Sequence, residues 1–145
     1  MTNGTVLIAE DSSDDFVLFK RALERARFAN PIQRVEDGEK AIAYLAGDGS
    51  YGDRTLFPMP VLFILDLKMP RRSGLEVLEW MQRHPVYKKL PVIVLTSSSQ
   101  HEDVNRAYSL GANSYLVKPG NFEDLIKLGK SMDDYWIGLN YPPEL

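Results

Sequence analysis

Carboxylate, hydroxyl and ammonium side chains stand directly after short apolar segments of this sequence. Glu10 and Asp11 follow the first such segment, and Asp66 follows the third. Thr96 and Lys118 follow the fourth and the fifth. Carboxylates brought close together repel one another and have raised pKa values unless a cation neutralises them. Oxygen-only ligands suit Mg²⁺, which keeps coordination positions open for phosphate oxygens, so the residue types predict a magnesium site that handles a phosphoryl group.

Asp66 is the central acid of this set and the expected nucleophile. A carboxylate can form an acyl phosphate, and the transfer depends mainly on positioning and on neutralising charge over the phosphoryl oxygens. Mg²⁺ and Lys118 would supply positive charge, and the Thr96 hydroxyl would hydrogen-bond a phosphoryl oxygen. The small Ser97 would leave room beside it. Each residue alone has an ordinary explanation, since Asp66 could cap a turn and Lys118 could lie on the surface, but their combination favours function.

The elements that position these residues alternate between two periodicities. Short apolar runs predict five strands, at residues 5–9, 32–35, 61–65, 91–95 and 114–117. Amphipathic segments predict helices at residues 14–28, around 38–45, 75–81 and 104–110, and at 122–139. Residues 47–60 hold three glycines and two prolines and are predicted to form a long loop.

Strands that alternate with helices, without hairpin signals, predict an α/β fold. Its parallel sheet would be covered on both faces by helices in right-handed crossovers. In such a sheet, ligands bind beyond the carboxyl ends of the strands, near the point where the strand order reverses. We therefore expect the side chains that follow four of the strands to converge at one edge of the sheet.

The composition is that of one ordinary globular domain. The chain has 145 residues, of which 44% are apolar and 26% charged, and we expect a single domain over residues 1–145, with its core at about 5–139 and a tail at 140–145. The net charge of −3 argues against nucleic acid binding, and the absence of cysteine excludes disulfides and thiolate chemistry. No apolar run is long enough for a bilayer and the start does not look like a secretory signal, so we expect a cytoplasmic protein without a membrane partner.

Four segments of the sequence are together similar to a known family. The segments VLIAED, FILDLKMP, VIVLTSSS and SYLVKP carry an acid pair, a lone Asp, a hydroxyl and a Lys-Pro pair in this order. The chain thus resembles the receiver domain of bacterial two-component response regulators over nearly its whole length. The resemblance implies a single receiver domain with a flavodoxin-like (βα)5 fold, a doubly wound five-stranded parallel sheet in the strand order 2-1-3-4-5.

The same resemblance implies that a sensor histidine kinase phosphorylates Asp66. It assigns Mg²⁺ to Asp11, Asp66 and the backbone carbonyl of Lys68, and it lets Glu10 contribute through water. Mn²⁺ or Ca²⁺ can replace Mg²⁺ in crystals. The peptide bond between Lys118 and Pro119 is expected to be cis.

A switch is also implied by the resemblance. Thr96 and Tyr115 would form the switch pair, although Tyr115 could equally be a packing residue. The hydroxyl would move toward the phosphoryl group and the ring would turn inward, which reshapes the face made by the fourth helix, fifth strand and fifth helix. Lys68 and Ser98 stand at positions that tune the lifetime of the phosphorylated state.

Three further features are similar to the stand-alone regulators that partner cyanobacterial and bacterial phytochromes. They are the acid-rich segment EDSSDDFVLFKRAL, the extended loop at 47–60 and the segment DDYWIGLNYPP. This similarity implies a phytochrome-type histidine kinase as partner. It also implies a homodimer formed through the face of the fourth helix, fifth strand and fifth helix together with the tail. Tyr135, Trp136 and Tyr141 are candidate dimer contacts, with cover of the sheet as their alternative role.

Other functions remain open at this point. The chain could be an intermediate phosphoryl carrier in a multi-step phosphorelay, or a receiver that has lost phosphorylation and acts as a scaffold. An aspartate-nucleophile phosphatase would carry a second Asp two residues after the nucleophile, where this sequence has Lys68. We therefore expect a protein that is no enzyme beyond promoting its own phosphorylation and dephosphorylation, and that acts through protein contacts.

Overall fold

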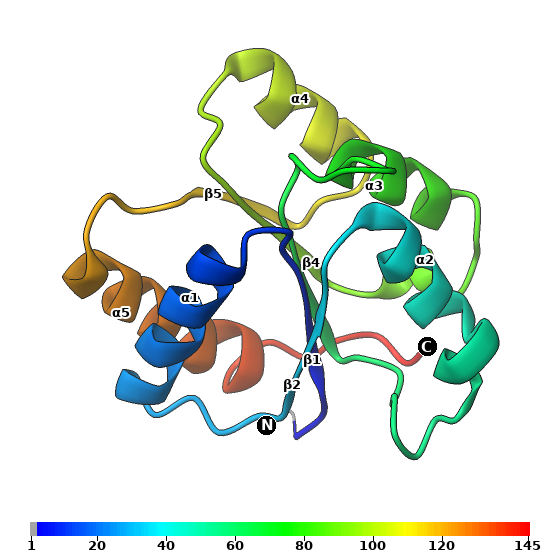
Figure 1. The fold of residues 1–145 in the computed structure, drawn as a ribbon, viewed down its shortest axis with the longest axis horizontal. Helices are drawn as coiled ribbons and strands as arrows, with labels where there is room; N and C mark the ends of the chain where they lie inside the picture. Colours follow the sequence, from blue (N-terminus) through cyan, green and yellow to red (C-terminus); the bar gives the residue numbers. More distant parts are fainter. Residues whose placement is uncertain (1–2) are drawn as a thin grey trace.

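One parallel sheet forms the centre of the molecule in a computed structural model that describes residues 3–145 (Figure 1). The five strands lie in the order β2-β1-β3-β4-β5. Their bounds are β1 Val6–Ala9, β2 Ile32–Val35, β3 Leu62–Leu65, β4 Val92–Thr96 and β5 Ser114–Val117. The predicted parallel sheet and its strand order are confirmed, and every strand lies within one residue of its expected bounds.

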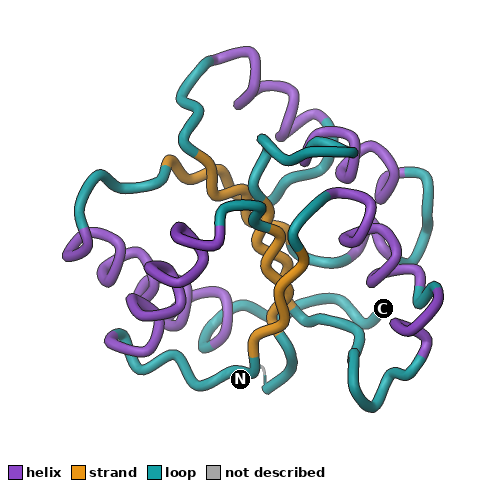
Figure 2. Tube along the Cα trace, in the orientation of Figure 1, coloured by secondary structure: helices purple, strands orange, loops and turns teal. Residues whose placement is uncertain are grey.

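Helices cover both faces of the sheet, which confirms the doubly wound architecture (Figures 1 and 2). One face carries α1, Ser13–Arg25, and α5, Phe122–Ser131; the other carries α2, Gly38–Ala46, α3, Gly74–Gln82, and α4, His101–Ser109. Two short 3₁₀ turns, η1 Gly49–Gly52 and η2 Tyr87–Lys89, lie in the loops. Among the helices of residues 3–145, none is long and apolar enough to cross a membrane.

The strand side chains alternate between the two faces. Leu7 and Ala9 of β1 belong to the core under α2, α3 and α4, whereas Val6 and Ile8 belong to the core under α1 and α5. β3 and β4 divide in the same way. Because both faces are covered, these strands read in the sequence as continuous apolar runs.

Side-chain caps fix where the helices begin. Four helices have a capping residue whose side chain accepts a hydrogen bond from the backbone N–H three residues later: Ser12, Asp37, Ser73 and Asn121. The first of these caps matters most for the site, since α1 begins immediately after the Glu10-Asp11 pair. The cap therefore sets the position of the acid pair relative to the helix.

The long loop at 47–60 is anchored to α2. Arg54 donates hydrogen bonds to the carbonyls of Tyr44 and Leu45, each at 2.8 Å, and to the carbonyl of Phe57 at 3.2 Å. The Tyr44 hydroxyl donates to the carbonyl of Pro58 at 2.8 Å. Carbonyls in the last turn of a helix lack their usual partner within the helix, so Arg54 gives the Leu45 carbonyl a donor and adds a second one to the Tyr44 carbonyl, which also accepts from the Gly47 N–H at 3.2 Å.

Three helices differ from their predicted bounds, among them α4, which begins at His101 rather than at residue 104. α1 ends at Arg25 rather than at residue 28, since Arg27 adopts a positive φ of 63°. α5 ends at Ser131, and a π-helical segment, η3 Met132–Ile137, continues it. The wider turn lets Met132 and Ile137, five residues apart, both face the core at 1% and 3% exposure.

Candidate functional site

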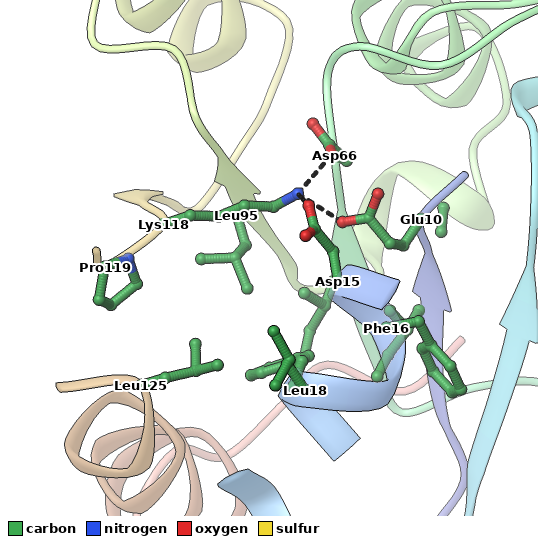
Figure 3. A pocket seen from close by; sticks show the side chains of 13 residues that line it. Glu10, Asp15, Phe16, Leu18, Asp66, Leu95, Lys118, Pro119 and Leu125 are labelled. Carbon is green, nitrogen blue, oxygen red and sulfur yellow. Dashed lines mark hydrogen bonds and ion pairs between the residues drawn. The ribbon is translucent and has the colours of Figure 1, made fainter. Parts of the chain in front are cut away.

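Lys118 lies at the centre of the site, at the carboxyl edge of the sheet. Its Nζ donates hydrogen bonds to Glu10 Oε1 at 2.5 Å, to Asp66 Oδ2 at 2.9 Å and to Asp15 Oδ2 at 3.0 Å (Figure 3). Its backbone N–H donates to the carbonyl of Thr96 at 2.8 Å, which joins the ends of β5 and β4. The structure thus brings together residues that follow or end four different strands.

Glu10, Asp11 and Asp66 form an acid cluster. One carboxylate oxygen of each lies within 4.8 Å of the others. Glu10 and Asp66 are buried, whereas Asp11 is exposed. Burial raises the pKa of Glu10 to about 7; the charge of Asp66 adds to this effect and the hydrogen bond from Lys118 opposes it. Three carboxylates with buried members and oxygen-only ligands suit a hard divalent cation, so the acid cluster fits such a metal.

The ammonium of Lys118 remains charged despite its partial burial. Burial alone would lower the pKa of Lys118, but the hydrogen bonds to Glu10, Asp66 and Asp15 outweigh it and hold that pKa above its ordinary value. Asp66 therefore faces a permanent positive charge.

Asp66 is held by backbone groups on its other side. Its own N–H donates to the carbonyl of Ala9 at 3.1 Å, and the N–H of Lys68 donates to Asp66 Oδ1 at 3.2 Å. A Cβ at Gly74 would lie 2.3 Å from the Asp66 carbonyl oxygen, so only glycine lets α3 begin so close to this residue. The Lys68 side chain is exposed, and metal binding by its carbonyl remains a prediction.

Thr96, the last residue of β4, carries a hydroxyl that has no hydrogen-bond partner in the described part of the chain. The residue is fully buried, and no group in residues 3–145 hydrogen-bonds its Oγ1. Buried hydroxyls normally have a partner, because burying one unpaired costs free energy. An oxygen of a ligand bound beside Lys118 would supply that partner. The neighbouring Ser97 is exposed, and its role beside the phosphoryl group remains a prediction.

Tyr115 of β5 reaches the loop that follows β4. Its hydroxyl donates to the carbonyl of Ser98 at 2.8 Å, and Ser98 Oγ donates to Asp103 Oδ2 at 2.5 Å. The ring of Tyr115 packs against the core under α2, α3 and α4. Tyr115 therefore ties β5 to the start of α4 in this structure.

Two residues of the site were not predicted from the sequence. Asp15, in the first turn of α1, is the third acceptor for Lys118, and its place four residues after Asp11 is a weak signal that could have found it. Arg34 of β2 donates from Nε to the carbonyl of Glu10 at 3.1 Å and from Nη2 to the carbonyl of Asp11 at 3.3 Å. Arg34 thus fixes the backbone of the acid pair, through carbonyls that leave no trace in the sequence.

The prediction of a cis peptide bond between Lys118 and Pro119 is wrong. Every peptide bond between residues 3 and 145 is trans. The trans form is the ordinary preference of an X-Pro bond, by about 0.5–1 kcal/mol, and here the Lys118 side chain reaches the acids from a trans backbone.

The candidate dimer residues divide into two kinds. Tyr135 and Tyr141 are exposed, by 52% and 92%. Trp136 is half-buried against the core under α1 and α5, and its ring meets that of Tyr135 edge-to-face at 5.1 Å. Trp136 thus serves as cover for the sheet, and the dimer contact remains a prediction.

A cavity of about 100 Å³ lies beside Lys118, between α1 and α5. Asp15 and Lys118 lie at its polar end, and Phe16, Leu18 and Leu125 form apolar walls (Figure 3). The cavity therefore adjoins Asp66 and Lys118 at the carboxyl edge of the sheet and extends between apolar side chains.

Known proteins match nearly the whole chain. A family model described as the response regulator receiver domain matches residues 6–129. The chain is 39% identical over 138 residues to the probable methanogenesis regulatory protein FilR2 of Methanothrix harundinacea, which covers 95% of this chain and 86% of FilR2. It is 35% identical over 132 residues to the response regulator Rcp1 of Synechocystis sp., which covers 91% of this chain and 88% of Rcp1.

Solved structures match the fold equally well. The crystal structure of the phosphorylated cyanobacterial phytochrome response regulator RcpA has a TM-score of 0.90 at 30% identity, covering 99% of this chain and 100% of RcpA. The Mn²⁺-bound form of Rcp1 has a TM-score of 0.85 at 34% identity, covering 96% of this chain and 98% of that one.

Proposed function

This chain belongs to the response regulator receiver domain family, and we propose that it is a signalling protein switched by phosphorylation of Asp66. One observation carries the proposal: Asp66 lies 2.9 Å from the Lys118 ammonium and within the acid cluster. A carboxylate placed there contacts the Lys118 ammonium and, together with Glu10 and Asp11, would hold a divalent cation. Histidine kinases phosphorylate receiver domains, so a histidine kinase is the proposed donor.

In the proposed reaction, a carboxylate oxygen of Asp66 attacks the phosphorus of a phosphohistidine. The oxygen–phosphorus bond forms as the phosphorus–nitrogen bond breaks, and the imidazole leaves with the electron pair of that bond. Mg²⁺, held by the acid cluster and the Lys68 carbonyl, would neutralise charge on the phosphoryl oxygens. Lys118 would exchange its bond to Asp66 Oδ2 for one to a phosphoryl oxygen.

The switch would start at Thr96. A phosphoryl oxygen would give the buried Thr96 hydroxyl the partner that it lacks among residues 3–145, and the loop after β4 would move with it. Tyr115 holds that loop through Ser98, and Ser98 holds α4 through Asp103. The surface of α4, β5 and α5 would therefore change, and the output would be altered protein binding.

We further propose a phytochrome-type histidine kinase as the partner. Support comes from RcpA, a cyanobacterial phytochrome response regulator whose structure matches 99% of this chain. A homodimer through the face of α4, β5 and α5 with the C-terminal tail is part of the proposal, with Tyr135 and Tyr141 as its exposed aromatic contacts. The protein would act in the cytoplasm, where kinases find ATP.

The decisive experiment measures covalent phosphorylation of Asp66. Wild-type protein incubated with acetyl phosphate and Mg²⁺, or with a phosphorylated phytochrome kinase, should gain one phosphoryl group by intact-protein mass spectrometry. Asp66→Asn should gain none, and Asp48→Asn, at an exposed site in the loop after α2, should behave as wild type. An Asp66→Asn protein that still gained the group, or a wild-type protein that gained none from either donor, would contradict the proposal.

A further inference from the structure

Asp15 contributes a third carboxylate to Lys118 from a different element. The Asp15 side chain is 48% exposed, whereas those of Glu10 and Asp66 are 8% and 7% exposed. In the described part of the chain, Asp15 stands outside the acid cluster that fits a metal. Its negative charge would therefore stay at the solvent side of the site when a cation neutralises the cluster.

The ammonium of Lys118 has no spare donor. A lysine ammonium carries three N–H groups, and three carboxylates take one hydrogen bond each, at 2.5, 2.9 and 3.0 Å. A phosphoryl oxygen that needs Lys118 must compete with these acceptors. Asp66 loses its hydrogen bond from Lys118 when it becomes an acyl phosphate, but Asp15 continues to accept one from the ammonium.

Backbone contacts hold Asp15 in this position. The N–H of Asp15 donates to Ser12 Oγ at 3.2 Å, and the N–H of Ser12 donates to Glu10 Oε2 at 3.1 Å. The start of α1 is thereby tied to the acid cluster itself. Asp15 also lines the polar end of the cavity beside Lys118, so its charge faces the space that adjoins Asp66.

We propose that Asp15 is a positioning residue that restrains Lys118 and repels small dianionic phosphoryl donors, and so limits phosphorylation of Asp66 without a kinase. This inference rests on the proposed function. In the reaction concerned, an Asp66 oxygen bonds to the phosphorus of acetyl phosphate as the bond from phosphorus to the acetyl oxygen breaks, and acetate leaves. Asp15 takes part in neither bond. Its negative charge weakens the positive electrostatic potential that attracts acetyl phosphate to the site.

The test compares single substitutions in the first turn of α1. Asp15→Asn removes the charge but keeps an acceptor for Lys118, Asp15→Ala removes both, and Asp15→Glu restores the charge. Asp14→Asn is the matched control, because Asp14 is an exposed carboxylate in the same turn. Asp14→Asn and Asp15→Asn each remove one negative charge near the N-terminus of α1. Initial rates are measured with saturating Mg²⁺ over a range of acetyl phosphate concentrations, at low and high salt, and again with the less charged donor phosphoramidate.

We expect Asp15→Asn and Asp15→Ala to raise the rate with acetyl phosphate by about 3- to 10-fold. This is the effect expected from removing one nearby charge that solvent and salt partly screen. The gain should appear at donor concentrations below saturation, shrink in high salt and be smaller with phosphoramidate. Asp15→Glu, which restores the charge, should reverse most of this gain, and Asp14→Asn should match wild type.

Two outcomes would overturn the inference while leaving the proposed function intact. One is wild-type protein phosphorylated on Asp66 while both Asp15→Asn and Asp15→Ala react at the wild-type rate or more slowly. The other is an equal gain in Asp14→Asn, which would assign the effect to overall charge rather than to the contact with Lys118. A wild-type protein that is phosphorylated by neither small donor nor by a kinase would remove the proposed function and this inference together.

Discussion

Tyr115 donates a hydrogen bond to the backbone carbonyl of Ser98 at 2.8 Å, from β5 to the loop that follows β4. Ser98 passes the connection on, because its hydroxyl donates to Asp103 in α4. Two neighbouring hydrogen bonds thus link the strand next to Thr96 with the helix at the proposed output face. A movement of the loop after Thr96 would therefore pass to α4 through these two hydrogen bonds.

Removing one oxygen atom tests this link. Tyr115→Phe keeps the packed ring but leaves the Ser98 carbonyl without its donor, so we expect the free energy of unfolding to fall by about 0.5–1.5 kcal/mol. Amide hydrogen exchange in residues 97–100 should become faster. Denaturant titration and exchange measurements check both effects, with Tyr108→Phe, at an exposed site on α4, as the control. Unchanged exchange in Tyr115→Phe would mean that the tyrosine does not hold the loop.

Thr96 should be needed for phosphoryl binding and not for folding. Thr96→Val removes a buried hydroxyl that has no partner in the described structure, so the free energy of unfolding should stay the same or rise by about 1 kcal/mol. Affinity for beryllofluoride with Mg²⁺, which mimics the phosphoryl group, should fall by about 10- to 100-fold, equivalent to one hydrogen bond to a charged group. Thr96→Ser should retain most of that affinity. A stable Thr96→Val protein with wild-type affinity would exclude contact between the hydroxyl and the phosphoryl group.

The stability of the metal-free protein should depend on pH through Glu10. The pKa of Glu10 is about 7 in the folded protein against 4.5 ordinarily, so the folded state holds a proton that the unfolded chain has already released between these values. The stabilising contribution is complete below pH 4.5 and is lost as pH rises to about 7, by at most about 3 kcal/mol. Urea unfolding in chelator from pH 4.5 to 7.5 measures this loss.

Glu10→Gln provides the control for that experiment. The amide does not ionise, so the variant should lose much less stability over the same pH range. Adding Mg²⁺ to the wild-type protein at pH 7.5 should restore stability, since the ionised acid cluster is the form that binds a cation. Identical pH profiles for wild type and Glu10→Gln would show that another group is responsible.

Arg34 should control metal affinity from outside the acid cluster. Arg34→Lys keeps the positive charge but cannot hold the carbonyls of Glu10 and Asp11 with two donors of one rigid fork. We expect Mn²⁺ or Mg²⁺ affinity to fall by about 10-fold, as is common for residues that orient metal ligands. Isothermal titration calorimetry measures it, with Arg25→Lys at an exposed position of α1 as control. Equal affinities in the two variants would assign Arg34 a purely packing role.

The convergence of the site could be predicted because strand register carries it. Ala9 pairs with Leu65, so the residues that follow them, Glu10 and Asp66, leave the sheet side by side. Thr96 pairs with Val117, the residue before Lys118, in the same way. Parallel strands end at one edge, and a strand that is buried on both faces is easy to locate from its apolar run.

The contacts of Asp15 and Arg34 could not be predicted by the same reasoning. Asp15 meets Lys118 only because α1 begins at a particular rotation, which its cap and the packing against α5 set together. Arg34 binds backbone carbonyls, which every residue possesses. The end of α5 could not be predicted for a similar reason. The π-helical turn depends on burying both Met132 and Ile137 in the core, and no local sequence preference marks it.

Anchoring of the 47–60 loop by Arg54 has a practical consequence for following this protein in experiments. The loop precedes the amino end of β3, so it lies at the edge of the sheet opposite to the one where Asp66 stands. The 145-residue sequence contains no cysteine, and Ser50 of this loop is exposed, so Ser50→Cys would give this sequence a single attachment point for a fluorophore. A dye there would report rotational tumbling and self-association of the protein without contacting the residues around Asp66 at the carboxyl edge of the sheet.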